Sequence, residues 1–274
     1  MKINNITLGC DPEIFLRNSN NELVSSCGKF KGTKNSPFPL TDVGHYMQED
    51  NVALEFNIPP AIDKKSFKRD INKSLFLIEE IANGKELKIA IESSGNFKNE
   101  DLEHPKAKEF GCMPDFNAWK KRVNNPPSPS TNLRTCGGHI HIGYDNPKLK
   151  LNLSLIKAMD LFVGIPSLFL DNDNLRRSMY GKAGCFRNKN FGVEYRVVSN
   201  FWIKQDNLIE WVWDSTLNAI NFVNNNELNV LDSSSFKIED IINNNDKDLG
   251  VEVMKHYEIN LPILKKQLKH INYG

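Results

Sequence analysis

Four segments of the chain alternate between apolar and polar side chains, which is the pattern of a β-strand with one buried face. They cover residues 9–15, 51–57, 137–143 and 193–197. Because successive strand residues point to opposite faces, the polar residues of each segment share a face. These pairs are Asp11 and Glu13, Glu55 and Asn57, His139 and His141, and Glu194 and Arg196. The pattern predicts the floor of one polar, metal-binding pocket.

Three further stretches have the spacing of helices. The first begins after Asp63, which can cap it, and ends at Asn83 and Gly84. Its apolar positions recur every three or four residues: Phe67, Ile71, Leu75, Ile78 and Ala82. Residues 151–170 are expected to form a largely buried helix that is interrupted or bent near Pro166, and residues 207–223 a second long helix.

The remaining segments complete an α+β prediction. Residues 87–91 indicate a short strand, 110–119 a structured loop, 124–132 a flexible connector and the residues after 225 a small helical tail. Alternating strands mixed with helices favour a mainly antiparallel sheet with helices packed on one face only. The other face is then free to be a site.

Composition narrows the class of protein. The chain has 274 residues, 39% of them hydrophobic, and 35 basic against 34 acidic residues give a net charge of +1, so no global field attracts nucleic acid. No apolar stretch reaches the length of a membrane span, and the start lacks the apolar core of a signal peptide, so we expect a cytoplasmic protein. Five scattered cysteines favour reduced thiols over a disulfide framework.

The acidic residues suggest hard cations. Three glutamates, an aspartate and one or two imidazoles make a mostly oxygen ligand set, which suits Mg²⁺ or Mn²⁺ better than a structural zinc site. An isolated His-x-His pair is equally typical of a solvent-facing strand, and a single strand glutamate such as Glu55 is usually a solvated surface residue. Only the ensemble argues for a site. Hard cations in turn suggest phosphate chemistry.

A cluster of basic residues near the fourth strand fits that chemistry, because guanidinium groups bind phosphate oxygens in pairs. Its members are Arg176, Arg177, Lys182, Arg187 and Arg196. Adjacent arginines at a helix end can instead interact with the helix dipole, which is the alternative for Arg176 and Arg177. The sequence contains neither a P-loop nor a Gly-x-Gly-x-x-Gly fingerprint, so phosphates would be held by side chains and metal ions on a sheet.

The order of these motifs resembles one family. Asp11-x-Glu13, the run from Asp50 to Asn57, Gly137 to Gly143, and the segment from Tyr180 through Arg196 are together similar to the phage-encoded carboxylate-amine ligase type 2 (amidoligase) family. That family is a distant member of the glutamine synthetase and glutamate-cysteine ligase superfamily. The resemblance covers about residues 6–220 and leaves the tail from about 225 outside it.

The resemblance implies a fold and an activity. The expected fold is a curved, mainly antiparallel sheet like the glutamine synthetase catalytic domain, with residues 1–225 as the catalytic domain and residues 226–274 as a helical extension packed on it. The implied activity is ATP- and Mg²⁺-dependent (or Mn²⁺-dependent) joining of a carboxylate to an amine through an acyl phosphate. A phage-encoded enzyme of this kind would act in the host cytoplasm.

The resemblance also implies roles for individual residues. The implied metal ligands are Asp11, Glu13, Glu55, His139 and Glu194. The implied nucleotide-binding residues are Arg177, Lys182, Arg187 and Arg196, of which the last two would hold the transferring phosphate. His141 would contact phosphate or substrate in catalysis. Asp11 stands where glutamine synthetase-like enzymes carry Glu, and Met113 stands where relatives are expected to carry an acid.

Two alternatives stay open at this point. The same fold could transfer phosphate to a guanidino group, which predicts a stable phosphorylated product without amide formation. It could also be a catalytically inactive phage binding or assembly protein, which predicts no affinity for nucleotide. The partners expected for the ligase are a small-molecule or peptide carboxylate and an amine, with no nucleic acid or membrane, and the sequence leaves the oligomeric state open.

Overall fold

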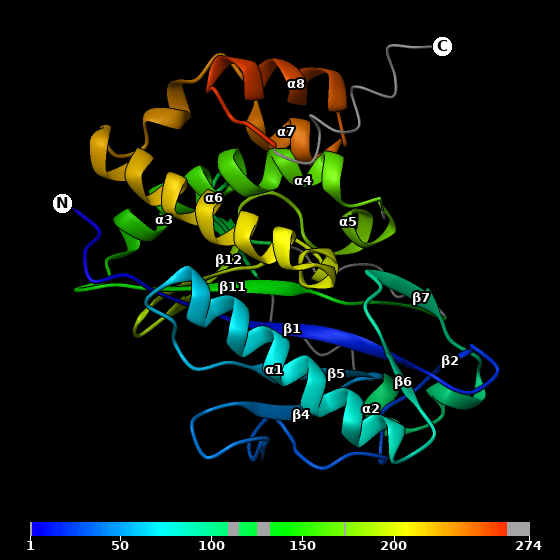
Figure 1. Cartoon of the computed structure of the whole chain (residues 1–274). Helices are drawn as coiled ribbons and strands as arrows, with labels where there is room; N and C mark the ends of the chain where they lie inside the picture. The colour runs from blue at the N-terminus through cyan, green and yellow to red at the C-terminus, as the bar shows by residue number, and fades with distance from the viewer. Residues whose placement is uncertain (1, 109–114, 125–131, 173, 262–274) are drawn as a thin grey trace, which may run out of the picture.

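Strand β1 (Thr7–Arg17) is the centre of the main sheet (Figure 1). The computed structural model describes residues 2–108, 115–124, 132–172 and 174–261. In this part of the chain the sheet runs in the order β3-β4-β5-β1-β11-β13-β12-β8-β9, with β2 and β6 also paired to β1, and its ladders are antiparallel. Met113 and most of the predicted connector over residues 124–132 lie outside the described residues.

Apart from β1, the strands of this sheet are short. They are β2 (Leu23–Val24), β3 (Phe38–Pro39), β4 (Tyr46–Asp50), β5 (Ala53–Asn57), β6 (Lys88–Ala90), β8 (Phe116–Asn117), β9 (Arg122–Val123), β11 (Gly138–Gly143), β12 (Cys185–Lys189) and β13 (Gly192–Tyr195). A separate pair is formed by β7 (Ser94–Asn96) and β10 (Leu133–Thr135). The four predicted strands are present as β1, β5, β11 and β13.

One of them begins later than its pattern indicated. Residues 51–57 alternate as a strand, but β5 starts at Ala53 because Asn51, with φ of 55°, turns the chain between β4 and β5. Asparagine tolerates this left-handed conformation better than most residues. The turn brings Asp50, the last residue of β4, beside the first residues of β5.

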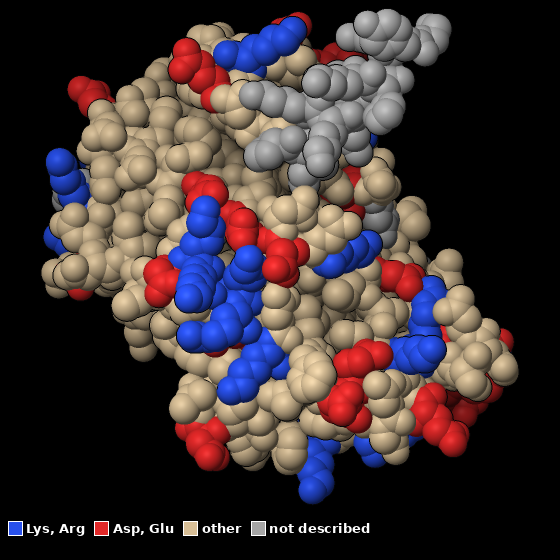
Figure 2. Space-filling view, viewed as in Figure 1, with Lys and Arg blue, Asp and Glu red and all other residues tan. Residues whose placement is uncertain are grey.

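The long helices cover one face of the sheet, as predicted. Asp63 caps α1 (Lys64–Asn83), accepting a hydrogen bond from the Ser66 amide, and α6 (Asp206–Asn225) packs beside α1. Ion pairs join the exposed sides of the two helices, with Lys64 2.8 Å from Asp214 and Lys68 2.5 Å from Glu210. Figure 2 shows basic and acidic side chains gathered over this part of the surface.

The other helices are short. They are η1 (Glu100–Leu102), α2 (Pro105–Lys108), α3 (Leu149–Met159), η2 (Asp160–Gly164), α4 (Ile165–Leu170), α5 (Leu175–Met179), η3 (Asn200–Lys204), η4 (Val230–Ser233), α7 (Ile238–Asn243) and α8 (Lys247–His256). Helices α7 and α8 pack on α4 (Figure 1). The division of the chain at residue 225 into a catalytic domain and a tail stays a prediction.

The helix predicted over residues 151–170 is interrupted by a π-helical turn. Helix α3 ends at Met159, the turn η2 follows, and the amide of Ile165 donates to the carbonyl of Asp160. Pro166 then occupies the first turn of α4, where its missing N–H costs no hydrogen bond. The prediction that no apolar stretch reaches the length of a membrane span is wrong for Leu149–Leu170, which is long and apolar enough by length and composition. However, 78% of its most apolar window is buried in the fold, as in the core helix of a globular protein.

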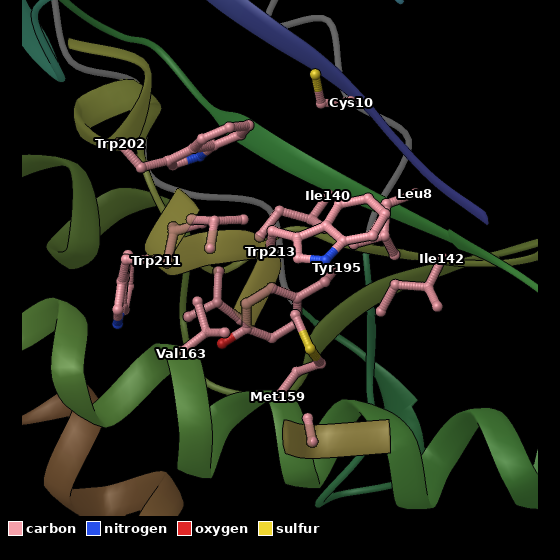
Figure 3. Packing of buried hydrophobic residues seen from close by; sticks show 14 of the residues in the cluster. Leu8, Cys10, Ile140, Ile142, Met159, Val163, Tyr195, Trp202, Trp211 and Trp213 are labelled. Carbon is pink, nitrogen blue, oxygen red and sulfur yellow. The ribbon is translucent and has the colours of Figure 1, made fainter. Parts of the chain in front are cut away.

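The core lies between the sheet and these helices. Figure 3 shows part of it, with Leu8, Cys10, Ile140, Ile142 and Tyr195 from the strands facing Met159, Val163, Trp202, Trp211 and Trp213. A second, smaller cluster forms on the opposite face, where Leu102 of η1 and Ala107 of α2 pack near Phe15. The fold class is as expected, and the short helices η1 and α2 add a local apolar cover at this end of β1, where Phe15 shares the face of Asp11 and Glu13.

Candidate functional site

The strand register brings the predicted polar pairs together. Asp11 lies opposite His139, and Glu13 lies opposite Glu55. On the far side of β11, His141 lies opposite Glu194, which in turn lies opposite Arg187. These side chains come from five strands, and all face away from the core described above.

A first group of three candidate cation ligands consists of Asp11, His141 and Glu194, whose ligand atoms lie within 4.8 Å of one another. His141 Nε2 is 3.2 Å from Asp11 Oδ2 and 3.9 Å from Glu194 Oε2. His141 Nε2 and Glu194 Oε2 are buried and have no well-formed hydrogen bond. Two carboxylates and an imidazole whose ligand atoms converge on one point fit a bound cation.

A second group consists of Glu13, Asp50 and Glu55, whose ligand atoms also lie within 4.8 Å of one another. Glu13 Oε2 accepts a hydrogen bond of 2.7 Å from the Gly137 amide. Among the described residues, no lysine or arginine forms an ion pair with these three carboxylates. Asp50 was missed as a ligand by the sequence analysis, although its motif was recognised. Only the β4–β5 turn brings it beside Glu55.

The ionisation of the two groups differs. Burial raises the pKa of Glu55 well above its ordinary value, and the negative charges of Asp11, Asp50 and Glu13 add to the effect. Burial also raises the pKa of Glu13, against the opposing influence of His139. A cluster of carboxylates that resists ionisation is stabilised by a divalent cation, so the second group fits a hard, oxygen-ligated ion.

In the first group, partners already stabilise the charges. Burial opposes the ionisation of Asp11, but His141 and His139 outweigh it and hold the pKa well below its usual range. Burial likewise opposes ionisation of Glu194, as does Asp11, yet His139, Arg196 and His141 lower the pKa to about 2. The pKa of His141 is raised despite its burial, chiefly by Asp11. Asp11 and Glu194 are therefore ionised at neutral pH.

Basic side chains of β12, and Arg196 directly after β13, surround Glu194. Arg196 Nη1 pairs with Glu194 Oε1, Lys189 Nζ lies 2.5 Å from Glu194 Oε2, and Arg187 Nη1 lies 3.7 Å from Oε1. Arg196 Nε also lies 2.7 Å from Asp115 Oδ1. Arg187 and Arg196 were predicted as phosphate-binding residues. Lys189 was missed, although its spacing of two from Arg187 places both on one strand face.

His139 lies between the first group and Arg196. Its Nδ1 is 3.1 Å from Asp11 Oδ1 and 3.1 Å from Arg196 Nη1, and the residue is in neither cation group. A Cβ on Gly137 would come within 2.4 Å of His139 Nε2, so only glycine lets the ring lie this close to the backbone. The sequence motif Gly137-Gly138-His139 thus reflects a close approach of ring and backbone.

Two cavities open onto this floor and share four of its residues, Glu13, Asp50, His139 and Arg196. The first cavity is also lined by Asp11 and by three basic side chains on its rim, Lys34, Arg187 and Lys189. The second cavity has a more mixed lining that includes Leu133, Arg134, Arg176, Met179 and Tyr180. The shared acidic and basic residues form the partition between two compartments.

Two of the predicted nucleotide-binding residues lie elsewhere. Arg177 is buried and donates from Nη2 to Ser167 Oγ of α4, and Lys182 is exposed in the turn before β12. Neither residue lines either cavity. Arg176 does line the second cavity, where its Nη1 donates to the Val197 carbonyl. The fold therefore separates the adjacent arginines and brings only one of them to the site.

The fold and the site define an α+β protein whose sheet carries two acidic cation groups and a set of arginines on its polar face. Residues 128–243 match the model of the phage phiEco32-like COOH.NH2 ligase-type 2 family. The match confirms the resemblance to that family and supports carboxylate-amine ligase activity. The match covers less than half of the chain. It includes the motifs of β11, β12 and β13 but not Asp11, Glu13 or Glu55.

The match also corrects the expected extent of the resemblance. Residues 226–243 lie inside it, so the first part of the helical tail shares the resemblance that was expected to end near residue 220. Helix α7 and the preceding η4 fall in this stretch. Both pack against the α3–α4 segment that backs the sheet.

Solved structures similar to the chain include apo GmaS without ligand, at 11% identity and a TM-score of 0.40, covering 96% of this chain and 71% of that one. A GmaS/ADP complex is similar at 10% identity and a TM-score of 0.38, covering 96% and 72%. Both scores are too low to carry a conclusion about this chain. A search of curated proteins finds no match.

Proposed function

We propose that the protein is an ATP-dependent carboxylate-amine ligase that uses Mg²⁺ or Mn²⁺ and forms an amide through an acyl phosphate. The observation that carries the proposal is the pair of acidic cation groups on the polar face of the sheet, where Glu13, Asp50 and Arg196 line two cavities at once. The family match adds support for the ligase class. A location in the cytoplasm, and the absence of nucleic acid or membrane partners, stay predictions.

Residues of both groups would hold the cations: Asp11, His141 and Glu194 in one, and Glu13, Asp50 and Glu55 in the other. Bound divalent ions would neutralise charge on the phosphates and on the phosphoryl group in transfer. His139 contacts Asp11 and Arg196 and would orient both side chains. The family resemblance also makes it a candidate metal ligand. The donor sets, carboxylate oxygens with one imidazole, suit these hard ions.

The basic residues would stabilise the transferring group. Arg187, Lys189 and Lys34 line the first cavity, which suits the phosphates of a nucleotide, and Arg196 lies in the partition where charge would develop in the transition state. The acid would then approach from the second cavity, because the attacking and leaving oxygens of phosphoryl transfer stand roughly in line. Its apolar and aromatic lining suits an organic acid.

The reaction has two balanced steps. An oxygen of the substrate carboxylate attacks the γ-phosphorus, the bond to the β-phosphate oxygen breaks, and ADP leaves the acyl phosphate. The amine nitrogen then attacks the acyl carbon, inorganic phosphate leaves with the bonding electron pair, and the nitrogen loses a proton. The protein contributes mainly by positioning the reactants and by electrostatic stabilisation.

The first test is calorimetric binding of a non-hydrolysable ATP analogue with and without Mg²⁺. We expect binding that depends on Mg²⁺ and that Glu194→Gln weakens at least about tenfold. Glu210→Gln, which neutralises an exposed carboxylate on α6, serves as the matched control and should bind like the wild type. No binding to the wild type would reject the ligase.

A second experiment separates the ligase from its alternatives. With Mg²⁺-ATP, candidate acids and candidate amines, the ligase forms ADP, phosphate and an amide. A stable phosphorylated guanidino compound without amide would identify a phosphotransferase instead. Nucleotide binding with no ADP formed from any acid and amine pair would favour a protein that has lost catalysis.

A further inference from the structure

A buried carboxylate lies behind the sheet, on the side opposite the candidate site. Asp160 is 0% exposed and is the first residue of the π-helical turn η2. Its Oδ1 accepts a hydrogen bond of 2.8 Å from the Tyr195 hydroxyl, and its Oδ2 accepts one of 2.6 Å from Trp119 Nε1. Burial raises the pKa of Asp160 to about 7, against the opposing effect of these two donors. A buried carboxylate without an ion pair is costly, so a function beyond packing is expected of it.

Tyr195 connects Asp160 to the acidic and basic residues of the site. It lies between Glu194 and Arg196 in sequence, and alternation along the chain places its ring in the core while their side chains lie on the opposite face of the sheet. Its neighbours across the sheet are Ile140 of β11 and Phe186 of β12. A displacement of the Tyr195 side chain would therefore move both flanking residues on the other face.

Trp119 connects Asp160 to the remaining carboxylate near Arg196. It follows β8, and Asn117 Oδ1 accepts hydrogen bonds from the amides of Trp119 and Lys120. The Trp119 ring also lies 5.4 Å from Nζ of Lys157, one turn before Asp160. Holding this segment holds Asp115, whose Oδ1 lies 2.7 Å from Arg196 Nε.

Two glycines permit these contacts. A Cβ on Gly164, in the π turn, would come within 2.9 Å of the Tyr195 hydroxyl, and one on Gly184 would come within 2.7 Å of the Trp119 ring. Both glycines thus allow a close approach of backbone to the hydrogen-bonded aromatic residues. The π turn itself is a distortion that recurs at functional sites.

We propose that Asp160 is a positioning residue, which holds Tyr195 and Trp119 and thereby sets the positions of Glu194, Arg196 and Asp115 on the opposite face of the sheet. The proposal rests on the function proposed above, since it assigns Asp160 to the cation and phosphate geometry. Asp160 itself touches none of the reacting groups. It lies one side-chain layer behind them.

The test uses Tyr195→Phe, which removes one hydroxyl and keeps the ring. We expect Mn²⁺-dependent binding of the non-hydrolysable ATP analogue to weaken about tenfold or more, measured by calorimetry well below the melting temperature. Tyr257→Phe is the matched control: it removes a partly buried hydroxyl that contacts Ser234, far from the sheet, and should leave binding unchanged. Wild-type affinity in Tyr195→Phe would overturn the proposal.

A purely stabilising role has a different signature. It would lower the melting temperature of Tyr195→Phe but leave the affinity of the folded protein intact. Asp160→Leu is the second variant: its side chain has a similar size and can accept neither hydrogen bond, so we expect the same loss of affinity.

Amide hydrogen exchange keeps the test independent of the ligase proposal. We expect Tyr195→Phe to speed exchange of the Glu194 and Arg196 amides in the ligand-free protein, with little change in α8. Unchanged exchange at both positions would overturn the proposal even if the wild type bound no nucleotide. Failure of the wild type to bind would instead reject the proposed function.

Discussion

Glu13 and Glu55 face each other in register across β1 and β5, and no basic side chain of the described residues pairs with either. Like charges directly opposite each other in a sheet are destabilising. Asp50 adds a third carboxylate to the same point. The arrangement is unfavourable in the absence of a cation and favourable in its presence, and this contrast leads to the first predictions.

Replacing Glu55 with Gln should stabilise the metal-free protein, because it removes a buried group that must either take up a proton or carry a charge beside three other carboxylates. We expect an increase of about 1 kcal/mol in the free energy of unfolding, or roughly 2–4 °C in melting temperature. The same variant should lose most of the stabilisation that Mg²⁺ gives the wild type. Thermal unfolding in EDTA and in excess Mg²⁺ measures both effects, and a variant that keeps the full response to Mg²⁺ would show that Glu55 is no ligand.

Divalent-ion affinity should rise with pH. The pKa of Glu55 is raised well above its ordinary value in the folded, metal-free protein, so a proton must leave before the carboxylate can bind a cation. Affinity therefore increases as the pH rises through the raised pKa and falls as the pH drops through it. Calorimetry with Mn²⁺ in buffers of different ionisation enthalpy reports the released proton. Affinity that does not vary with pH would contradict this coupling.

Arg187 should matter for turnover more than for folding. Its side chain is 30% exposed and lines the first cavity, so Arg187→Gln leaves the core intact. We expect ADP formation to fall about 10²-fold, which is typical of losing one donor to a developing charge. The melting temperature should change by no more than a few degrees. Lys182→Gln, in the exposed turn before β12, is the matched control and should retain activity.

The stability of the fold should depend on the ionisation of Asp160. Its pKa is about 7 in the folded protein, above the value near 4 of an unfolded aspartate, so the folded state binds the extra proton between these values. Its contribution is fully present below the unfolded pKa and is lost as the pH rises through about 7. The slope is at most about 1.4 kcal/mol per pH unit.

Urea unfolding of the wild type and of Asp160→Asn between pH 4 and pH 8 isolates this contribution. The stability difference between the two proteins should change with pH in that window, because only the wild type can lose a proton at this position. A constant difference would show that Asp160 keeps an ordinary pKa. Lys64→Ala, at the exposed ion pair with Asp214, should change stability by less than about 1 kcal/mol at every pH.

The strands and most of the polar floor could be predicted from the local pattern of residues alone. Alternation is a local property: it states which face Asp11, Glu13, His139 and His141 occupy before any partner strand is known. The cap at Asp63 and the spacing after it likewise predicted α1 to its last residue. These features depend on contacts within a few residues.

Which polar side chains lie together depends on how the strands and helices pack. Asp50 lies beside Glu13 and Glu55 because a turn at Asn51 pairs β4 with β5. Arg177 lies outside the site because its side chain donates a hydrogen bond to Ser167 of α4. Asp160 forms hydrogen bonds with Tyr195 and Trp119 from a π turn, which the periodicity of the sequence did not predict. Such contacts join residues far apart in the chain, and their geometry follows from register and packing rather than from local preference.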